Sequence, residues 1–155
     1  MKSVQDEIKQ TKPFASREEE AFLAIQLTAD RLSRRGAAVM KEFDISPAQY
    51  NTLRILRGAG KEGLACSEIG ERMINRDPDI TRMLDRLEKR GLVQRCRDQK
   101  DRRVITARIT KQGLHLLQSM DVPLREFLRK LLSSMGETKL RSVIRLLDEV
   151  RHSAS

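Results

Sequence analysis

The sequence is poor in several residue types, and each shortage excludes a class of protein. Only two of its 155 residues are cysteines, which is too few for a disulfide scaffold and favours a reducing compartment. Aromatic residues make up 3% and tryptophan is absent, which argues against binding of single strands by base stacking. No apolar run approaches the ~18 residues of a transmembrane helix, and no secretory signal is visible at the N-terminus. We therefore expect a cytoplasmic protein.

Positive charge, by contrast, is in excess. The chain has 31 Lys and Arg residues against 22 Asp and Glu, for a net charge of +9. Residues 1–45 are neutral overall, residues 46–110 carry +6 and residues 111–155 carry +3. A solvated basic face would explain this excess, and so would a polyanionic partner. The 39% of hydrophobic residues is enough for one packed core with helical extensions.

Long amphipathic helices are predicted on both sides of the middle segment. Over residues 18–44 and 114–135, apolar residues recur at alternating spacings of three and four. Pro123 is expected to kink the second helix or to break it in two, and Gly136 separates it from a final helix. These helices have more apolar surface than a small central domain can cover, so we expect a homodimer rather than a self-contained bundle. The residues expected at the dimer interface are Phe22, Ile25, Leu128, Leu131, Leu140, Val143 and Leu147.

The middle segment predicts three short helices followed by a β-hairpin. Residues 46–49, Ser-Pro-Ala-Gln, have the form of a capping box with proline at the first helical position. A short helix over residues 66–73 follows, and then Asp77 and Pro78 are expected to begin a third helix, which Gly91 ends. Two runs rich in Val, Ile and Thr, at 92–97 and 103–109, predict the strands. The predicted fold class is mainly α with a small β-hairpin, in the order of a winged helix-turn-helix.

The third of these helices has an apolar side and a basic side. Such a helix can bury one side in the domain and place the other in a major groove, where arginine pairs with guanine or phosphate. Asp85 lies on the basic side and would repel phosphate, so we expect it to orient Arg82 or Arg86. The alternative is an ordinary exposed helix face with ion pairs. A helix and a turn before this helix and a hairpin after it favour DNA recognition instead. The residues expected to bind DNA here are Arg76, Thr81, Arg82, Arg86 and Lys89.

The tip of the hairpin is a second basic segment. Lys100, Arg102 and Arg103 are expected to bind DNA there, because arginine is attracted to the negative potential of a narrow minor groove. Asp98 and Asp101 would be misplaced beside phosphate, and we expect them to orient the arginines or to cap the turn.

Residues 64–113 resemble the multiple-antibiotic-resistance-regulator (MarR) family of dimeric transcription factors. The matching segments are Ser67–Arg72 (Ser-Glu-Ile-Gly-Glu-Arg), the third helix and its continuation over Ile80–Val93, the hairpin tip Asp98–Arg103 (Asp-Gln-Lys-Asp-Arg-Arg) and Ile109–Gly113 (Ile-Thr-Lys-Gln-Gly). The hairpin segment is fairly specific for the family, whereas the helix segment is shared by many winged helices. In one departure, Ala65 and Cys66 stand where such proteins often place a capping Ser or Thr.

The resemblance implies a homodimeric repressor that binds a pseudo-palindromic operator and is released by a small-molecule effector. It implies that Thr81 and Arg82 face the major groove and that Arg102 or Arg103 enters the minor groove. The expected domains are an N-terminal dimerisation arm over 1–45, a DNA-binding domain over 46–110 and C-terminal dimerisation helices over 111–155.

Other motifs are weaker. Residues 58–63 match the dinucleotide pattern G-x-G-x-x-G, but a capped helix precedes them where that pattern needs a strand, so we expect a loop. His115 and His152 are not spaced for a metal site or a catalytic set. We expect no cofactor, no metal and no enzyme activity.

Two alternatives to an effector-controlled regulator stay open. Cys66 shares the apolar side of its helix, which favours a buried structural thiol, but its place in the first turn could lower its pKa and make it a redox sensor. Cys96, on the strand that leads to the hairpin tip, is similarly unconvincing as a sensor. The winged helix could also serve as a protein-interaction module instead of a DNA-binding one.

Overall fold

The computed structural model describes residues 2–75, 79–97 and 104–154 of the chain. The helices are α1 (Val4–Glu7), α2 (Arg17–Lys41), α3 (Pro47–Ala59), α4 (Cys66–Arg72), α5 (Ile80–Lys89), α6 (Lys111–Leu131) and α7 (Glu137–Ser153). The strands are β1 (Leu64–Ala65), β2 (Val93–Arg97) and β3 (Ile105–Ile109). The chain divides into two compact units, residues 1–118 and residues 119–155, with the boundary inside α6. The predicted fold class, mainly α with a small hairpin, is confirmed.

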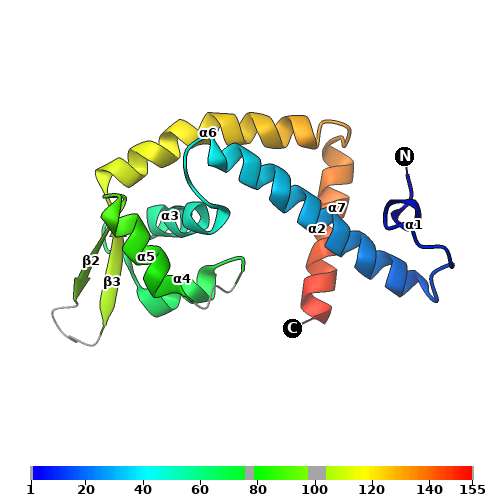
Figure 1. Cartoon of the computed structure of the whole chain (residues 1–155), viewed down its shortest axis with the longest axis horizontal. Coiled ribbons are helices and arrows are strands. Elements are labelled where there is room, and N and C mark those ends of the chain that lie inside the picture. Colours follow the sequence, from blue (N-terminus) through cyan, green and yellow to red (C-terminus); the bar gives the residue numbers. More distant parts are fainter. Residues whose placement is uncertain (1, 76–78, 98–103, 155) are drawn as a thin grey trace. The chain divides into compact units, whose positions relative to one another are not determined.

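The core of the first unit lies where α3, α4 and α5 meet the sheet (Figure 1). The side chains of Leu53, Leu56, Ile69, Leu84 and Leu87 are fully buried there. Burial of a leucine or isoleucine side chain contributes about 1.5 to 3 kcal/mol, so these few residues hold the three short helices together. Tyr50, on the same helix as Leu53 and Leu56, is half-buried.

Local signals set the ends of α3 and α5. The Ser46 hydroxyl accepts a hydrogen bond from the Gln49 amide at 3.1 Å, and the Gln49 side chain accepts one from the Ser46 amide at 3.0 Å, so the predicted capping box is confirmed. The predicted start of the third helix was wrong. Helix α5 begins at Ile80 and is capped by Asp79, whose carboxylate accepts from the Arg82 amide three residues on at 3.1 Å, whereas Asp77 and Pro78 lie outside the described residues. Gly91 ends the helix in the left-handed conformation, with φ of +70°.

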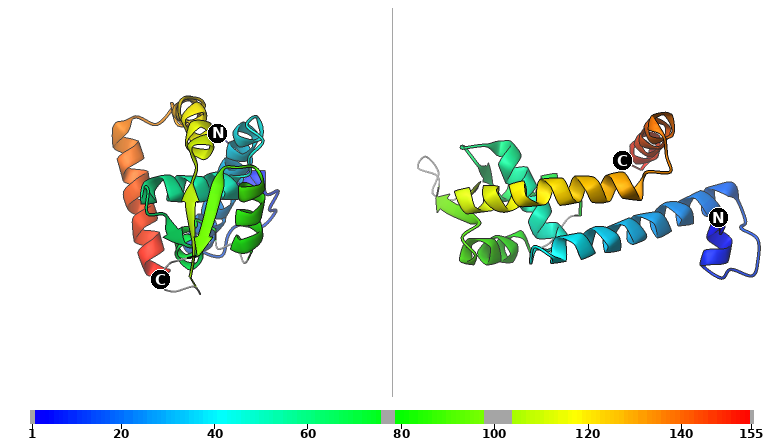
Figure 2. Two further views of the ribbon diagram at one scale, coloured as in Figure 1. Left: turned by 90° about the vertical axis from the view of Figure 1, so that its left-hand side faces the viewer. Right: turned by 90° about the horizontal axis from the view of Figure 1, so that it is seen from above.

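The sheet has three strands in the order β1-β3-β2, all antiparallel. The predicted hairpin is formed by β2 and β3, which pair from Val93 opposite Ile109 to Arg97 opposite Ile105 and run side by side in Figure 2. The strand β1, which has two residues and pairs with β3, was not predicted from the sequence. Gly63 enters this strand with φ of +73°, and its Cα lies so close to the Ala107 carbonyl that a Cβ atom would sit 2.3 Å from that oxygen. Only glycine fits there without strain.

Helix α2 extends away from the three short helices, with α1 beside its far end (Figure 2). Arg31 of α2 holds α1 through a two-pronged ion pair with Glu7, at 2.6 Å for the shorter contact. This bond lowers the pKa of the Glu7 carboxyl. The short α1 has its own capping box, in which Ser3 accepts from the Asp6 amide at 3.2 Å. Helix α1 was not predicted from the sequence.

The second unit consists of the rest of α6 and α7. Of the two expected effects of Pro123, a kink or a break, the break was wrong, because α6 continues through this residue as one helix. A proline removes one amide donor, a local loss that the hydrogen bonds of the remaining turns outweigh in a helix of 21 residues. Gly136 precedes α7 as its N-cap, as the sequence predicts. In the described part of the chain, no helix combines the length and the apolarity that a membrane span needs.

Candidate nucleic-acid interface

Helix α5 has the two-sided character that the sequence predicts. Met83, Leu84 and Leu87 are buried on one side. On the other side, the side chains expected to bind DNA are all exposed, namely Thr81, Arg82, Arg86 and Lys89. The helix is thus fixed by its apolar side and free to place its basic side in a groove.

Arg82 lies at the N-terminal end of this basic side. Its guanidinium Nε is 3.0 Å from the carboxylate of Asp79, the same group that caps the helix. Its side chain is 77% exposed, so the ion pair is solvent-screened and contributes at most about 1 kcal/mol. A phosphate or a guanine can therefore displace Asp79 from Arg82 at little cost.

Asp85 does not orient Arg82 or Arg86 as expected. Its carboxylate pairs instead with the guanidinium of Arg95 on β2, at 2.5 Å. The same guanidinium binds Glu88 at 2.7 and 2.9 Å, and the Arg95 backbone amide donates to Glu88 at 2.8 Å. The prediction failed because it considered only neighbours on the helix, whereas the partner comes from the sheet.

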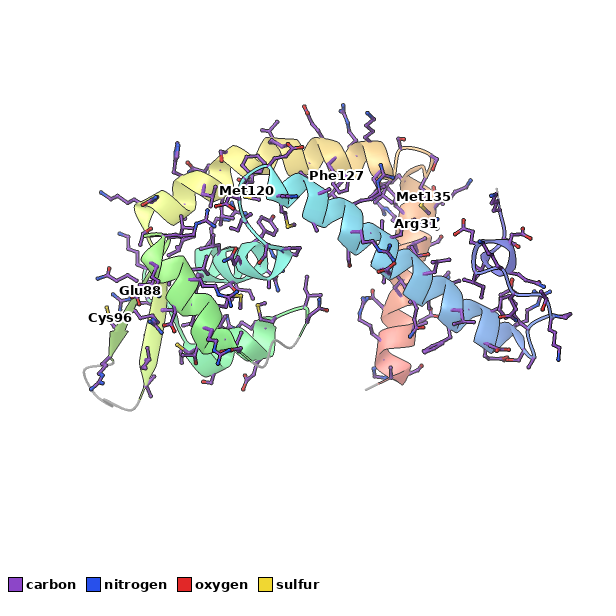
Figure 3. The ribbon with its side chains drawn as sticks, viewed as in Figure 1. Arg31, Glu88, Cys96, Met120, Phe127 and Met135 are labelled. Atoms are coloured by element: carbon purple, nitrogen blue, oxygen red, sulfur yellow. The ribbon has the colours of Figure 1, made fainter. Side chains whose placement is uncertain are left out.

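The contacts with Arg95 fasten α5 to the hairpin. Helix α5 and strand β2 are neighbours, and Figure 3 marks the helix by Glu88 and the strand by Cys96. The hydrogen bonds from the Arg95 amide and side chain lower the pKa of the Glu88 carboxyl, and the bond to Glu88 raises the pKa of Arg95. Both groups are therefore charged at neutral pH.

A second contact fastens the C-terminal end of α5. The Arg90 guanidinium donates to the backbone carbonyl of Asp44 and lies 3.6 Å from its carboxylate. Asp44 follows α2 and has φ of +52°, in the left-handed region that Asp tolerates better than most residues. Helix α5 is thereby attached to the corner between α2 and α3.

Six residues predicted to act at the DNA lie outside the described residues. They are Arg76 before α5, and Asp98, Lys100, Asp101, Arg102 and Arg103 between the two long strands. Their roles stay predictions.

The residues predicted at a dimer interface lie on surfaces that water reaches in the single chain. Phe22 on α2 is 60% exposed, and Leu128 on α6 is 52% exposed. Ile25 and Val143 are also exposed. The others are half-buried, namely Leu131, Leu140 and Leu147.

The structure disfavours Cys66 as a redox sensor. Burial raises the pKa of its thiol, against a smaller lowering by the charge of Arg95. The thiolate is the reactive form, so a raised pKa makes this thiol less reactive despite its place in the first helical turn. The N-cap of its helix is Ala65, which offers no side-chain acceptor, and Glu68 supplies a cap contact by accepting from the Ala65 amide at 3.2 Å.

The described residues form neither a dinucleotide-binding turn nor a metal site. Residues 58–63 form the end of α3 and the turn before β1, not a strand-to-helix turn. No group of three His, Cys, Asp or Glu side chains among the described residues could hold a metal ion.

Arg95 is the functional candidate that the sequence analysis missed. A signal was available: alternation along β2 places Arg95 on the same side as the buried Val93, so it faces the helices. A basic side chain in such a place needs acidic partners, and the neighbouring helix offers Asp85 and Glu88.

Comparison with known proteins points the same way as the geometry. A model of the MarR family matches residues 45–105. A crystal structure of a MarR transcription factor from Planctomyces limnophilus is 38% identical, covers 88% of this chain and 98% of its own, and superposes with a TM-score of 0.68. The HTH-type transcriptional repressor MdtR of Bacillus subtilis is 35% identical over 91 residues, which are 59% of this chain and 57% of its own. The fold is also similar to that of S. aureus MepR in a complex with DNA, with 22% identity, coverage of 84% and 95%, and a TM-score of 0.76.

Proposed function

The chain belongs to the MarR family of winged helix-turn-helix, DNA-binding transcriptional regulators, and we propose that it acts as a homodimeric repressor released by a small molecule. Its relatives are regulators and not enzymes. The proposal divides the chain into an arm over residues 1–45, a reading domain over 46–110 and dimerisation helices over 111–155.

The observation that carries the proposal is the two-sided α5. Its apolar side is locked in the core by Leu84 and Leu87, while Arg82, Arg86 and Lys89 are exposed on the other side. In a major groove about 12 Å wide, arginines on such a helix can reach base edges and phosphates. Arg102 or Arg103 of the hairpin would enter the flanking minor groove.

Dimerisation is supported by apolar side chains that the single chain leaves in water. On α2 these include Phe22, and on α7 they include Val143 and Ile144, the last 60% exposed. Exposed apolar surface of this extent is typical of an interaction site, and a symmetric pair of identical chains is the commonest arrangement that buries it. Two copies of α5 would then read two half-sites about one helical turn, or 10 to 10.5 base pairs, apart.

Release by an effector is supported by a cavity of about 570 Å³ in the first unit. It lies between the C-terminal half of α2, the start of α3 and the turn after α4, and Met40, Pro47 and Met73 form part of its wall. This volume lies within the range of about 300 to 1,000 Å³ that small-ligand pockets occupy. Met73, Ile74 and Asn75 precede α5 in the chain, so a ligand bound here would contact the segment that leads into this helix.

The experiment that tests the proposal is a run-off transcription assay. Sites selected from a random DNA pool are placed over a promoter, and purified protein is added at increasing concentration. We expect transcript to fall as the site fills, and log K for random duplex to fall steeply with log salt concentration. A protein-interaction module would give neither result: transcript would stay constant and the salt slope would be near zero.

A further inference from the structure

Arg95 is a basic residue of the hairpin that faces the protein, not the solvent. Its side chain is 22% exposed, and its guanidinium contacts two carboxylates of α5, those of Asp85 and Glu88. Its backbone amide makes a further bond to Glu88. These contacts use the Nε and Nη2 hydrogens of the guanidinium and direct that edge of it at α5.

Asp85 lies among the cations on the basic side of α5, which we call the reading side because it would face the DNA. Arg82 is three residues before it and Lys89 four residues after it, which are the spacings at which helical neighbours pair. In the structure Asp85 pairs with neither and is held by Arg95 at 2.5 Å. No acidic side chain of the described chain pairs with Arg86 or Lys89, so the contact with the sheet leaves the cations of the helix available.

We propose that Arg95 is a positioning residue for DNA reading, which holds Asp85 and Glu88 against the sheet and so keeps both carboxylates off the cations that face the DNA. This inference rests on the proposed function and extends it, because Arg95 contributes to affinity without touching DNA. Replacing Arg95 would release a carboxylate onto the reading side, where it would neutralise an arginine or repel a phosphate.

The test measures the Kd for a selected operator by fluorescence anisotropy, with thermal unfolding recorded for every variant. We expect Arg95→Gln to weaken binding about fivefold to tenfold, as coupled charges in contact typically do. We expect the double variant Arg95→Gln, Asp85→Asn to recover to within about twofold or threefold of the wild-type affinity, because the released carboxylate is then absent. Asp85→Asn alone should bind at least as tightly as the wild type.

Arg97→Gln is the matched control, because it removes the same charge from an exposed position on the same strand. Asp85→Asn should not restore its affinity. If Asp85→Asn rescues both arginine variants equally, net charge alone explains the effect and the inference is wrong.

Two further outcomes overturn it. If the double variant binds as weakly as Arg95→Gln, then Arg95 contacts DNA itself or acts only on folding. If Arg95→Gln does not fold, Asp85→Asn decides: weaker operator binding than wild type contradicts the inference, and equal or tighter binding supports it. Failure of the wild type to bind duplex at all would overturn the proposed function as well, whereas loss of the rescue with wild-type binding intact overturns this inference alone.

Discussion

Asp79 has two roles at the start of α5 that substitution can separate. One carboxylate oxygen accepts from the Arg82 amide at 3.1 Å, and the other pairs with the Arg82 guanidinium at 3.0 Å. Asp79→Ala removes both contacts, whereas Asp79→Asn keeps an acceptor for the amide and loses the charge. Asn and Asp are equally good N-caps, so the two variants should differ in stability.

The expected magnitudes follow from these contacts. Loss of the cap costs about 1 kcal/mol, and loss of the exposed ion pair adds less than about 1 kcal/mol, so Asp79→Ala should lose about 1 to 2 kcal/mol. In a chain of this size that lowers Tm by roughly 3 to 6 °C. Asp79→Asn should lose at most half as much. Differential scanning fluorimetry on the two variants and the wild type measures this difference.

The same variants should have the opposite effect on DNA binding. A carboxylate about 8 Å from a phosphate in watery surroundings is repelled by about 0.5 kcal/mol, which is about a twofold change in Kd. Asp79→Asn should therefore bind random duplex about twofold tighter at low salt, and the gain should vanish at about 1 M salt. Equal destabilisation by Asn and Ala would refute the cap, and weaker binding by Asp79→Asn would refute the placement of this end of α5 beside the DNA.

Three further predictions concern other parts of the chain. Arg82→Ala should cost about 1 to 3 kcal/mol of binding to a selected operator and much less to random duplex, as measured by competition titration; equal losses on both would contradict base reading. Gly63→Ala should destabilise the protein by about 2 to 4 kcal/mol, because the added Cβ atom would lie 2.3 Å from the Ala107 carbonyl oxygen at a residue with positive φ. Gly58→Ala, where a Cβ atom would meet nothing within 4 Å, should instead stabilise the protein by about 0.5 to 1 kcal/mol. Urea unfolding of both variants measures these changes in the free energy of unfolding. The pKa of Glu88 is lowered in the folded chain, so its contribution to stability is present above its ordinary value near 4.5 and is lost as the pH falls through the folded-state pKa. Wild type should therefore lose Tm more steeply than Glu88→Gln between about pH 5 and pH 3, and parallel curves would contradict the role of the Arg95 contact.

The features predicted correctly from the sequence are those whose physical cause is local. The capping box needs only Ser46 and Gln49, three residues apart, and the end of α5 needs only Gly91 in the left-handed conformation. The apolar side of α5 follows from the period of the helix, with Met83, Leu84 and Leu87 buried as expected. The start of the same helix was misplaced because Asp77 and Asp79 are both good caps, and proline at 78 favoured the wrong one.

The features that were missed depend on contacts between distant segments. The strand β1 has two residues and no pattern of its own, and only its pairing with β3 forms it. Asp44 and Arg90 are 46 residues apart, and their contact forms only when the turn after α2 and the end of α5 come together. The partner of Asp85 was assigned within the helix, whereas the folded chain supplies Arg95 from β2. Such pairings depend on tertiary packing, and the spacing of residues along one helix carries no information about it.

The most direct test of the account is the stoichiometry and footprint of the protein on a site selected from random DNA. Native mass spectrometry of the complex should give two chains per duplex, and hydroxyl-radical footprinting should give an inverted repeat whose half-sites lie about 10 to 10.5 base pairs apart. Arg82→Ala should remove protection at the centre of both half-sites together, since one residue reads each. One chain on one asymmetric site, or a footprint unchanged by Arg82→Ala, would contradict a symmetric dimer that reads DNA through α5.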